Sequence, residues 1–415
     1  MDACSLWSVL CSLKLSLRNL NNYNYLIEKN NYLTEKINYL YEFLCKSATE
    51  IFRFRGTFLF FAVGFYKKPL PFSFYFVILQ RIMKHNYLLV ILMLSLAAVF
   101  SCKGNQAVTE GENIDSVALC GPAFSEDSAY DYCAKQCEFG PRIMNSKAHE
   151  DCRQWIAEKF RSFGLEVIEQ NAKLMGYDGT SLNSTNIIAQ YNPEAEKRIL
   201  FCAHWDARPW ADNDPDEANH KTPIDAANDG ASGVAVMLEM ARLLQQDSLP
   251  YGVDFICFDA EDWGLPQWEE EYLGNSEDTW ALGAQYWSEH SHKEGYKANC
   301  GVLLDMVGGA GARFYFELYS KQAAPSVQQT VWAAARTTGY SSYFPMEDGG
   351  YITDDHVPVI KNAGIPCIDI IPYYPDCEQS SFGPTWHTVN DNMQNISKET
   401  LKAVGQTLVQ VLYQQ

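Results

Sequence analysis

Two patterns of apolar and polar positions alternate along this chain: short, almost wholly apolar runs and longer stretches of helical period. The runs at 253–258 and 301–304 are typical of strands that are covered on both faces of a sheet. Other stretches repeat their apolar positions every three or four residues, which favours amphipathic helices. The apolar positions of one such stretch are Val234, Met237, Leu238, Ala241 and Leu244.

These patterns predict helices and strands that alternate from about residue 147 to the end of the chain. The predicted helices are 147–163, 230–246, 280–291, 323–338, 356–363 and 397–413. The predicted strands are 164–169, 185–191, 198–203, 252–258, 299–305, 313–318 and 366–371. The predicted fold class is therefore α/β, a three-layer α/β/α sandwich around a mixed, mostly parallel central sheet.

The first hundred residues follow a different pattern. The basic start Met83-Lys84-His85-Asn86 precedes an apolar run at 87–100 and then Ser101-Cys102. This order is typical of a secretory signal, and the run is too short for a comfortable membrane span. A small residue followed by cysteine resembles a bacterial lipobox. We therefore expect a signal peptide at 83–101, a bacterial cell-envelope protein lipid-anchored at Cys102 (periplasmic or outer-membrane associated), a tether at 102–120 and one catalytic domain at 121–415.

A signal sequence is not expected in the interior of a chain, so residues 1–82 are interpreted as an over-extended start rather than part of the protein. The alternative is a membrane segment with two anchors, built on the apolar stretches at 57–66 and 70–80. Nine cysteines follow Cys102, and those at 120, 133, 137 and 152 cluster in a stretch predicted to be irregular. Export permits disulfides there.

Charge separates the two parts of the chain and excludes one class of partner. Residues 103–415 carry 21 Lys and Arg against 46 Asp and Glu, a formal net charge of −25. Such a surface repels nucleic acid and anionic lipid and favours cationic or neutral partners. We therefore expect no nucleic-acid binding, contact with a membrane only through the lipid anchor, and a monomer.

Polar side chains follow several predicted strands at the point where each strand ends. His204 and Asp206 follow one strand, Glu261 and Asp262 follow the next, and Asp305 ends a third. Because the carboxyl ends of parallel strands meet at one edge of the sheet, these side chains are expected to converge. Asp229 stands just before a helix, where capping is the alternative explanation. Carboxylates and imidazoles together are the ligands that zinc accepts.

Two further motifs carry a resemblance to a known family. They are Trp386-His387-Thr388, with Asp391-Asn392 behind it, and Thr353-Asp354-Asp355-His356-Val357-Pro358. Together with the carboxylates at the strand ends, these motifs resemble those of the zinc aminopeptidase superfamily. The resemblance covers roughly residues 140–415. Within that superfamily the chain resembles the animal-type glutaminyl cyclases (glutaminyl-peptide cyclotransferases) and their bacterial relatives.

The resemblance implies a role for each matching position. One zinc ion would be held by Asp229, Asp262 and His387. Glu261 would be the general acid/base, with Asp305 and Asp354 as a hydrogen-bonded carboxylate pair beside it. The residues implied in substrate binding are Trp386, Trp268 and Asp369. The implied reaction converts the N-terminal glutamine of peptides or proteins to pyroglutamate and releases ammonia.

The chain departs from the animal pattern at three places. Asp262 replaces a glutamate, which shortens that ligand by one methylene group. Asp369 stands where the animal enzymes carry a histidine. The tryptophan loop after Asp262 is out of step by about one residue, which weakens the match of Trp268 to the family's loop tryptophan.

Two alternatives remain open. In a dizinc aminopeptidase, His204 would complete a second metal site with Asp229 bridging and Asp305 as a further ligand, and Glu261 would activate water. Metal analysis would then find two zinc ions rather than one. The minor alternative is a non-catalytic lipoprotein that uses the same fold for binding.

Overall fold

In the computed structural model, a six-stranded sheet forms the centre of the described residues, which are 119–269 and 271–414. Its strand order is β1-β2-β4-β3-β5-β6; β2 is antiparallel to both of its neighbours and the other pairs are parallel. The strands are β1 (Glu166–Met175), β2 (Ser181–Tyr191), β3 (Arg198–His204), β4 (Gly252–Phe258), β5 (Cys300–Leu304) and β6 (Cys367–Ile370). The predicted mixed sheet is confirmed.

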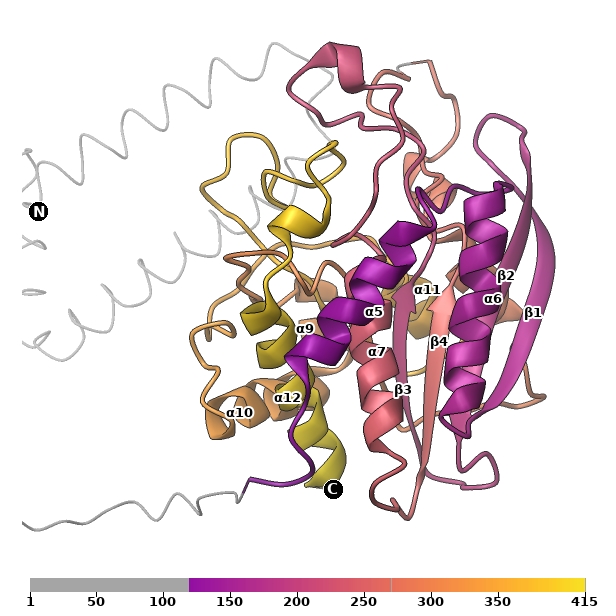
Figure 1. The fold of residues 1–415 in the computed structure, drawn as a ribbon. Helices are drawn as coiled ribbons and strands as arrows, with labels where there is room; N and C mark the ends of the chain where they lie inside the picture. The colour runs from indigo at the N-terminus through magenta and orange to yellow at the C-terminus, as the bar shows by residue number, and fades with distance from the viewer. Residues whose placement is uncertain (1–118, 270, 415) are drawn as a thin grey trace, which may run out of the picture. The chain divides into compact units, whose positions relative to one another are not determined.

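Helices cover both faces of this sheet, which gives three layers (Figure 1). Along β3, Phe201 and Ala203 face one apolar core, whereas Leu200 and Cys202 face the other, because successive strand residues point to opposite faces. The larger core is covered by α5 (Glu126–Glu138), α6 (Lys147–Ser162), α7 (Ala231–Leu243), α10 (Pro325–Thr337) and α12 (Lys398–Tyr413). The smaller core is covered by α8 (Leu282–Glu289) and α11 (His356–Lys361).

Helix α7 lies at the centre of the larger core. Every residue of α7 except Arg242 is buried, because α5 and α12 pack on the side that the sheet does not cover. Helix α5 was not predicted from the sequence because it has few apolar positions. Its start is set by the side chain of Ser125, which accepts the backbone N–H of Ser128.

The predicted strand at 313–318 is wrong. Only isolated bridges occur there, Phe314 with Pro372 and Phe316 with Asp348, and the short helix α9 (Leu318–Ala323) follows at once. The alternating aromatic rings instead pack on α10: Phe316 lies 5.0 Å from Trp332, measured between ring centroids. The alternation of apolar positions therefore results from packing against a helix and does not indicate a strand of the sheet.

The region expected to be irregular, where export would permit disulfides, is largely helical. Cys133 and Cys137 lie in α5, Cys152 lies in α6, and all three are free thiols. The Cys133 thiol donates to the carbonyl oxygen of Ala227 at 3.0 Å, and Cys152 is fully buried in the apolar core. In the structure, helix packing holds these three positions without a disulfide among them.

The predictions for the beginning of the chain concern residues outside the described part. These are the over-extended start at 1–82, the signal peptide at 83–101 and the acylated Cys102; the tether at 102–120 enters the described part only at its end. Within residues 119–269 and 271–414, no helix combines the length and hydropathy needed to cross a bilayer. The domain boundary at residue 121 remains a prediction.

Candidate functional site

The carboxyl ends of β3, β4 and β5 place the predicted polar residues at one edge of the sheet. His204 is the last residue of β3, Glu261 and Asp262 follow β4, and Asp305 follows β5. These strands run parallel to one another, so their ends meet, as the sequence predicted. The turn before α7 brings Asp229 to the same edge.

Asp229, Asp262 and His387 form a compact group of buried ligand-type atoms, all within 4.8 Å of one another. The His387 Nε2 atom lies 3.5 Å from Asp229 Oδ2 and 3.3 Å from Asp262 Oδ1. Ligands around a tetrahedral zinc ion are separated by about 3.4 Å, given bonds of about 2.0–2.2 Å. Asp229 Oδ2 and Asp262 Oδ2 are buried without a hydrogen-bond partner. These residues therefore fit a divalent metal ion.

The ring of His387 is nearly parallel to two neighbouring indole rings. The Trp386 ring centroid lies 3.8 Å from that of His387, and the Trp280 centroid lies 5.9 Å away at an interplanar angle of 13°. His387 Nδ1 faces Asp212 Oδ1 at 3.4 Å, which leaves Nε2 directed at Asp229 and Asp262. Carboxylate partners of this kind fix the orientation of metal-binding histidines.

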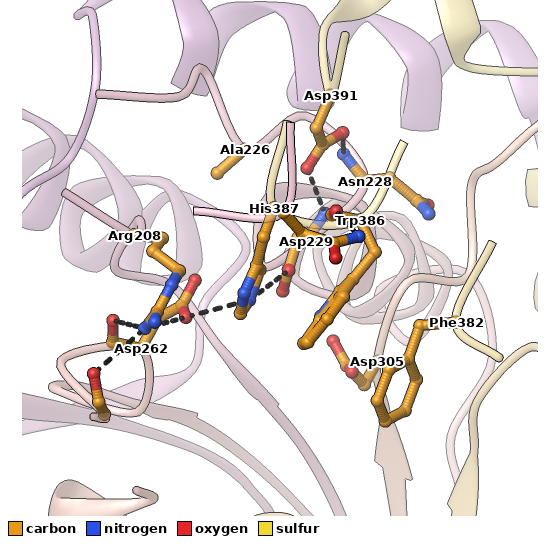
Figure 2. Close-up of polar contacts among 12 residues, drawn as sticks. Arg208, Ala226, Asn228, Asp229, Asp262, Asp305, Phe382, Trp386, His387 and Asp391 are labelled. Carbon is orange, nitrogen blue, oxygen red and sulfur yellow. Dashed lines mark hydrogen bonds and ion pairs between the residues drawn. The ribbon is translucent and has the colours of Figure 1, made fainter. Parts of the chain in front are cut away.

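The turn at Asp229 is held in place by Asp391, which follows the Trp386-His387-Thr388 motif (Figure 2). The Asn228 and Asp229 backbone N–H groups donate to the two carboxylate oxygens of Asp391 at 2.7 and 3.0 Å. Burial and the neighbouring Asp229 carboxylate raise the pKa of Asp391 to about 7. The next residue, Gly230, has a φ of +100°, and a Cβ there would lie 2.8 Å from the carbonyl oxygen of Asp206. Asp391 thus links the His387 loop to the Asp229 turn.

Glu261 and Asp262 are positioned by Asp206. Their backbone N–H groups donate to Asp206 Oδ1 and Oδ2, both at 3.1 Å. Ala260, which precedes them, has a φ of +54°. Left-handed backbone at a residue other than glycine costs energy and is typical of functional sites. His387 and Met306 share this geometry, with φ of +53° and +50°.

A buried cation lies beside this turn. Arg208 donates to the Asp262 carbonyl oxygen at 3.1 Å and to both carboxylate oxygens of Asp212 at 2.7 Å. Figure 2 shows Arg208 and Asp262 on one side of His387 and Trp386 on the other. The sequence analysis missed Arg208 and Asp212, because both stand in a long loop whose spacing carries no motif.

A second group of ligand-type atoms shares Asp229 with the first. His204 Nε2 lies 3.0 Å from Asp229 Oδ1 and 3.4 Å from Asp305 Oδ1. His204 Nδ1 faces Asp206 Oδ1 at 3.5 Å. His204, Asp229 and Asp305 are buried, with ligand-type atoms within 4.8 Å of one another. The residues needed for a second metal ion are therefore close together.

Acidic side chains line the floor of a cavity of about 240 Å³ at this edge. Burial raises the pKa of Glu261 well above its usual range. Burial and the neighbouring Asp354 carboxylate raise the pKa of Asp305 to about 8, and burial also raises that of Asp354. Among the described residues, no hydrogen bond joins Asp305 to Asp354. The acidic and histidine residues that line the cavity, called its floor here, are Asp229, Glu261, Asp305, Asp354 and His387.

Apolar side chains form a further part of the cavity lining. Trp386 lines the cavity, and its ring centroid lies 4.8 Å from that of Phe382. The sequence analysis did not identify the other apolar wall residues, which are Trp280, Met306, Ile352, Ile371 and Phe382. They stand in loops where single apolar residues give no periodic signal.

Two residues expected to bind substrate lie elsewhere. Trp268 is 38% exposed and packs against Trp210 and His220, and it is not among the lining residues of the cavity. Asp369 is fully buried in β6 and faces His356. Their positions do not favour direct contact with a molecule in this cavity; Trp280 is the loop tryptophan that reaches it.

A protein-family model matches the part of the chain that contains this site. The model of peptidase family M28 matches residues 186–412. The chain belongs to peptidase family M28. The match includes every residue of the two ligand-type groups, so both sit within the M28 region.

Solved structures of similar proteins carry two kinds of name. A glutaminyl cyclase of Bacteroides thetaiotaomicron, bound to N-acetylhistamine, is 51% identical; the match covers 71% of this M28 chain and 99% of that one, with a TM-score of 0.68. A Zn-dependent exopeptidase of Parabacteroides distasonis is 48% identical, with 70% and 99% covered and a TM-score of 0.69.

Curated relatives are more distant. Aminopeptidase YwaD of Bacillus subtilis is 30% identical over 254 residues, which is 59% of this chain. The glutaminyl-peptide cyclotransferase of Gloydius blomhoffii is 27% identical over 253 residues, which is 54% of this chain. The matched part of this M28 chain spans 47% of the aminopeptidase and 63% of the cyclotransferase.

Proposed function

We propose that this chain is a zinc-dependent glutaminyl-peptide cyclotransferase. It would convert the N-terminal glutamine of peptides or proteins to pyroglutamate and release ammonia. The observation that carries this proposal is the cavity of about 240 Å³, in which Glu261, Asp305 and Asp354 face apolar walls beside the Asp229, Asp262 and His387 group. Its size suits a single residue, since pockets for larger ligands measure about 300–1,000 Å³. Two similar proteins of solved structure, at 51% and 50% identity, are glutaminyl cyclases, which supports the same function.

The metal ligands of the proposal are Asp229, Asp262 and His387. Three protein ligands leave zinc an open position, and the bound ion would polarise a carbonyl oxygen. Asp391 and Asp212 would hold two of these ligands in place, through the Asp229 turn and the His387 ring. One zinc ion per chain is expected.

Glu261 is the proposed general acid/base. It would accept a proton from the α-amino group of the substrate and then donate it to the departing ammonia. The amine and the γ-amide belong to one residue, so the site mainly has to orient them. Asp305 and Asp354 would hold the amine; burial raises the pKa of both carboxyl groups, and the Asp354 charge adds to the rise at Asp305, so the two do not both ionise readily.

The apolar walls have a separate role. Trp386, Phe382 and Ile352 would exclude water from the carbonyl, so that the internal amine attacks it and hydrolysis does not compete. This role separates a cyclase from a peptidase, which has to admit water to the same position.

The experiment is to incubate the purified zinc-loaded protein with a glutamine-initiated peptide and follow the products by mass spectrometry. Loss of one ammonia with an unchanged chain length is expected, and Glu261→Gln should abolish it. Glu277→Gln is the matched control, because Glu277 is exposed at the cavity rim. Release of a free N-terminal amino acid would instead identify an aminopeptidase.

That aminopeptidase is the second candidate. The observation that favours it is the group of His204, Asp229 and Asp305, which could hold a second zinc ion with Asp229 bridging. Glu261 would then activate water. Two zinc ions per chain, one of them lost in His204→Ala, together with the released amino acid would support this candidate.

We also propose that the protein is anchored to a bacterial cell envelope through acylated Cys102 and acts as a monomer. The support for the anchor is the order of basic, apolar and cysteine residues at 83–102. Incorporation of a labelled fatty acid, absent in Cys102→Ser, would test the anchor. Light scattering of the detergent-purified protein would test the monomer.

A further inference from the structure

A second cavity, of about 570 Å³, lies between α6 and the hairpin formed by β1 and β2. Ser146, His149 and Arg153 line it from the first turns of α6 and the residue before that helix, and Lys173 lines it from β1. None of these residues lines the cavity at the sheet edge or belongs to a ligand-type group there. Pockets of about 300–1,000 Å³ are typical of sites for small organic ligands.

Lys173 is a cation on the side of β1 that faces α6. Glu169, four residues earlier in β1, binds Arg153 and Arg161 of α6. Side chains an even number of residues apart in a strand point to the same face, so Lys173 shares this orientation. Among the described residues, no carboxylate lies within ion-pair distance of Lys173. This is notable because residues 103–415 carry a formal net charge of −25.

The charged groups of α6 beside this cavity are balanced by carboxylates. Glu150, which also lines the cavity, accepts two hydrogen bonds from Arg153 at 2.9 and 2.6 Å. The hydrogen bond from Arg153 lowers the pKa of Glu150 to about 2. Arg153 and Arg161 thus face Glu150 and Glu169, two charges against two, which leaves Lys173 in excess. Helix α6, with 16 residues, begins at the cavity, and its dipole adds positive charge there.

His149 brings an unpaired nitrogen to the same cavity. The residue is only 4% exposed, its Nε2 lies 2.8 Å from Asp259 Oδ1, and its ring stacks on Trp205 with 4.2 Å between centroids. Among the described residues, Nδ1 makes no hydrogen bond, so it is the nitrogen left for a ligand. Burial opposes a charge on this ring, but the Asp259 carboxylate outweighs it and raises the pKa of His149. A charged ring donates from Nδ1 to an anion.

We propose that this cavity binds a small organic molecule through a phosphate group, which Lys173 and His149 contact. A phosphate monoester carries about −1.5 to −2 charges at pH 7, which matches an ammonium, an imidazolium and the start of a helix. Hydrogen bonds of this kind, between charged partners, are the strong ones. The remaining volume holds the organic part of the molecule. The site uses no residue of the proposed reaction, so it does not depend on that reaction.

Calorimetric titration of the zinc-loaded full chain tests the proposal, with glucose 6-phosphate and glucose as probes. Saturable binding of glucose 6-phosphate and no binding of glucose are expected. Lys173→Met, which keeps the aliphatic part of the side chain, should weaken the binding by about tenfold or more. Lys197→Met is the matched control, because Lys197 is exposed just before β3, at the end opposite His204. No saturable binding overturns the proposal. Equal affinity in Lys173→Met and the wild type also overturns it, since the phosphate is then bound elsewhere.

A crystallographic measurement avoids any variant that fails to fold. Wild-type crystals soaked in glucose 6-phosphate should show the phosphate group within hydrogen-bond distance of Lys173 Nζ and His149 Nδ1. A map with the phosphate only at Asp229 and His387, or with no phosphate at all, overturns the proposal.

Discussion

The backbone N–H of Asp229 donates to Asp391 Oδ2 at 3.0 Å, and this bond joins two segments 162 residues apart. Asp391 follows His387 by four residues and Asp229 stands before α7, so one carboxylate aligns both proposed metal ligands. The second oxygen of Asp391 accepts the N–H of Asn228. The proposed metal centre would therefore depend on a residue that is not itself one of its ligands.

Asp391→Asn is expected to weaken zinc binding by about 10–100-fold, as other outer-shell changes do. The amide keeps the shape of the carboxylate but replaces one acceptor oxygen with a donor that faces a backbone N–H. Zinc affinity is measured by competition with a chromophoric chelator, with Asp376→Asn as the exposed control. Unchanged affinity in Asp391→Asn would contradict the proposed alignment.

Glu261→Gln is expected to lower kcat by about 10²–10⁴-fold while zinc content stays unchanged. Glutamine cannot accept the amine proton, whereas the ligand group of Asp229, Asp262 and His387 is left intact. The measurement combines steady-state kinetics on a glutamine-initiated peptide with metal analysis. Loss of zinc in this variant would show that Glu261 is a ligand rather than the base.

Trp386→Ala is expected to lower kcat/KM by about fivefold or more, since losing a stacked aromatic wall costs about 1 kcal/mol or more. The change removes both the cavity wall and the ring against His387. Trp268→Ala is the matched control and should have little effect, because Trp268 packs outside the cavity. An equal loss in Trp268→Ala would restore its predicted role in substrate binding.

The stability of the fold should decrease as pH falls, in part because of His292. Burial lowers the pKa of His292, and its Nδ1 accepts the N–H of Trp287 at 3.1 Å. A lowered pKa in the folded state means that the stabilisation is present above the unfolded pKa of about 6.5 and is lost as pH falls through the folded pKa.

His292→Gln should therefore lose less unfolding free energy than the wild type between about pH 7.5 and pH 5. Denaturant unfolding at the two pH values measures this difference. His290→Gln, at the exposed end of α8, should follow the wild type. Identical pH dependence in His292→Gln and the wild type would exclude His292 as a source of the effect.

Much of the fold could be predicted from the sequence because its signals are local. The runs at 198–203 and 252–258 are buried on both faces, and the structure has strands there within one residue of the prediction. Residues directly after parallel strands necessarily reach one edge of a sheet, so the convergence of His204, Glu261 and Asp305 also followed. The prediction of a strand at 313–318 was wrong because the same alternation of apolar positions arises when a loop packs on a helix.

The α/β fold class and the residues that meet at the sheet edge follow from hydropathy and spacing along the chain. Only the folded structure shows that Trp280 and not Trp268 reaches the cavity, that Asp369 faces His356, and that Arg208 donates to the Asp262 carbonyl oxygen. Long loops take their conformation from contacts between distant segments. Hydropathy and spacing describe only neighbours along the chain, and they leave those contacts unspecified.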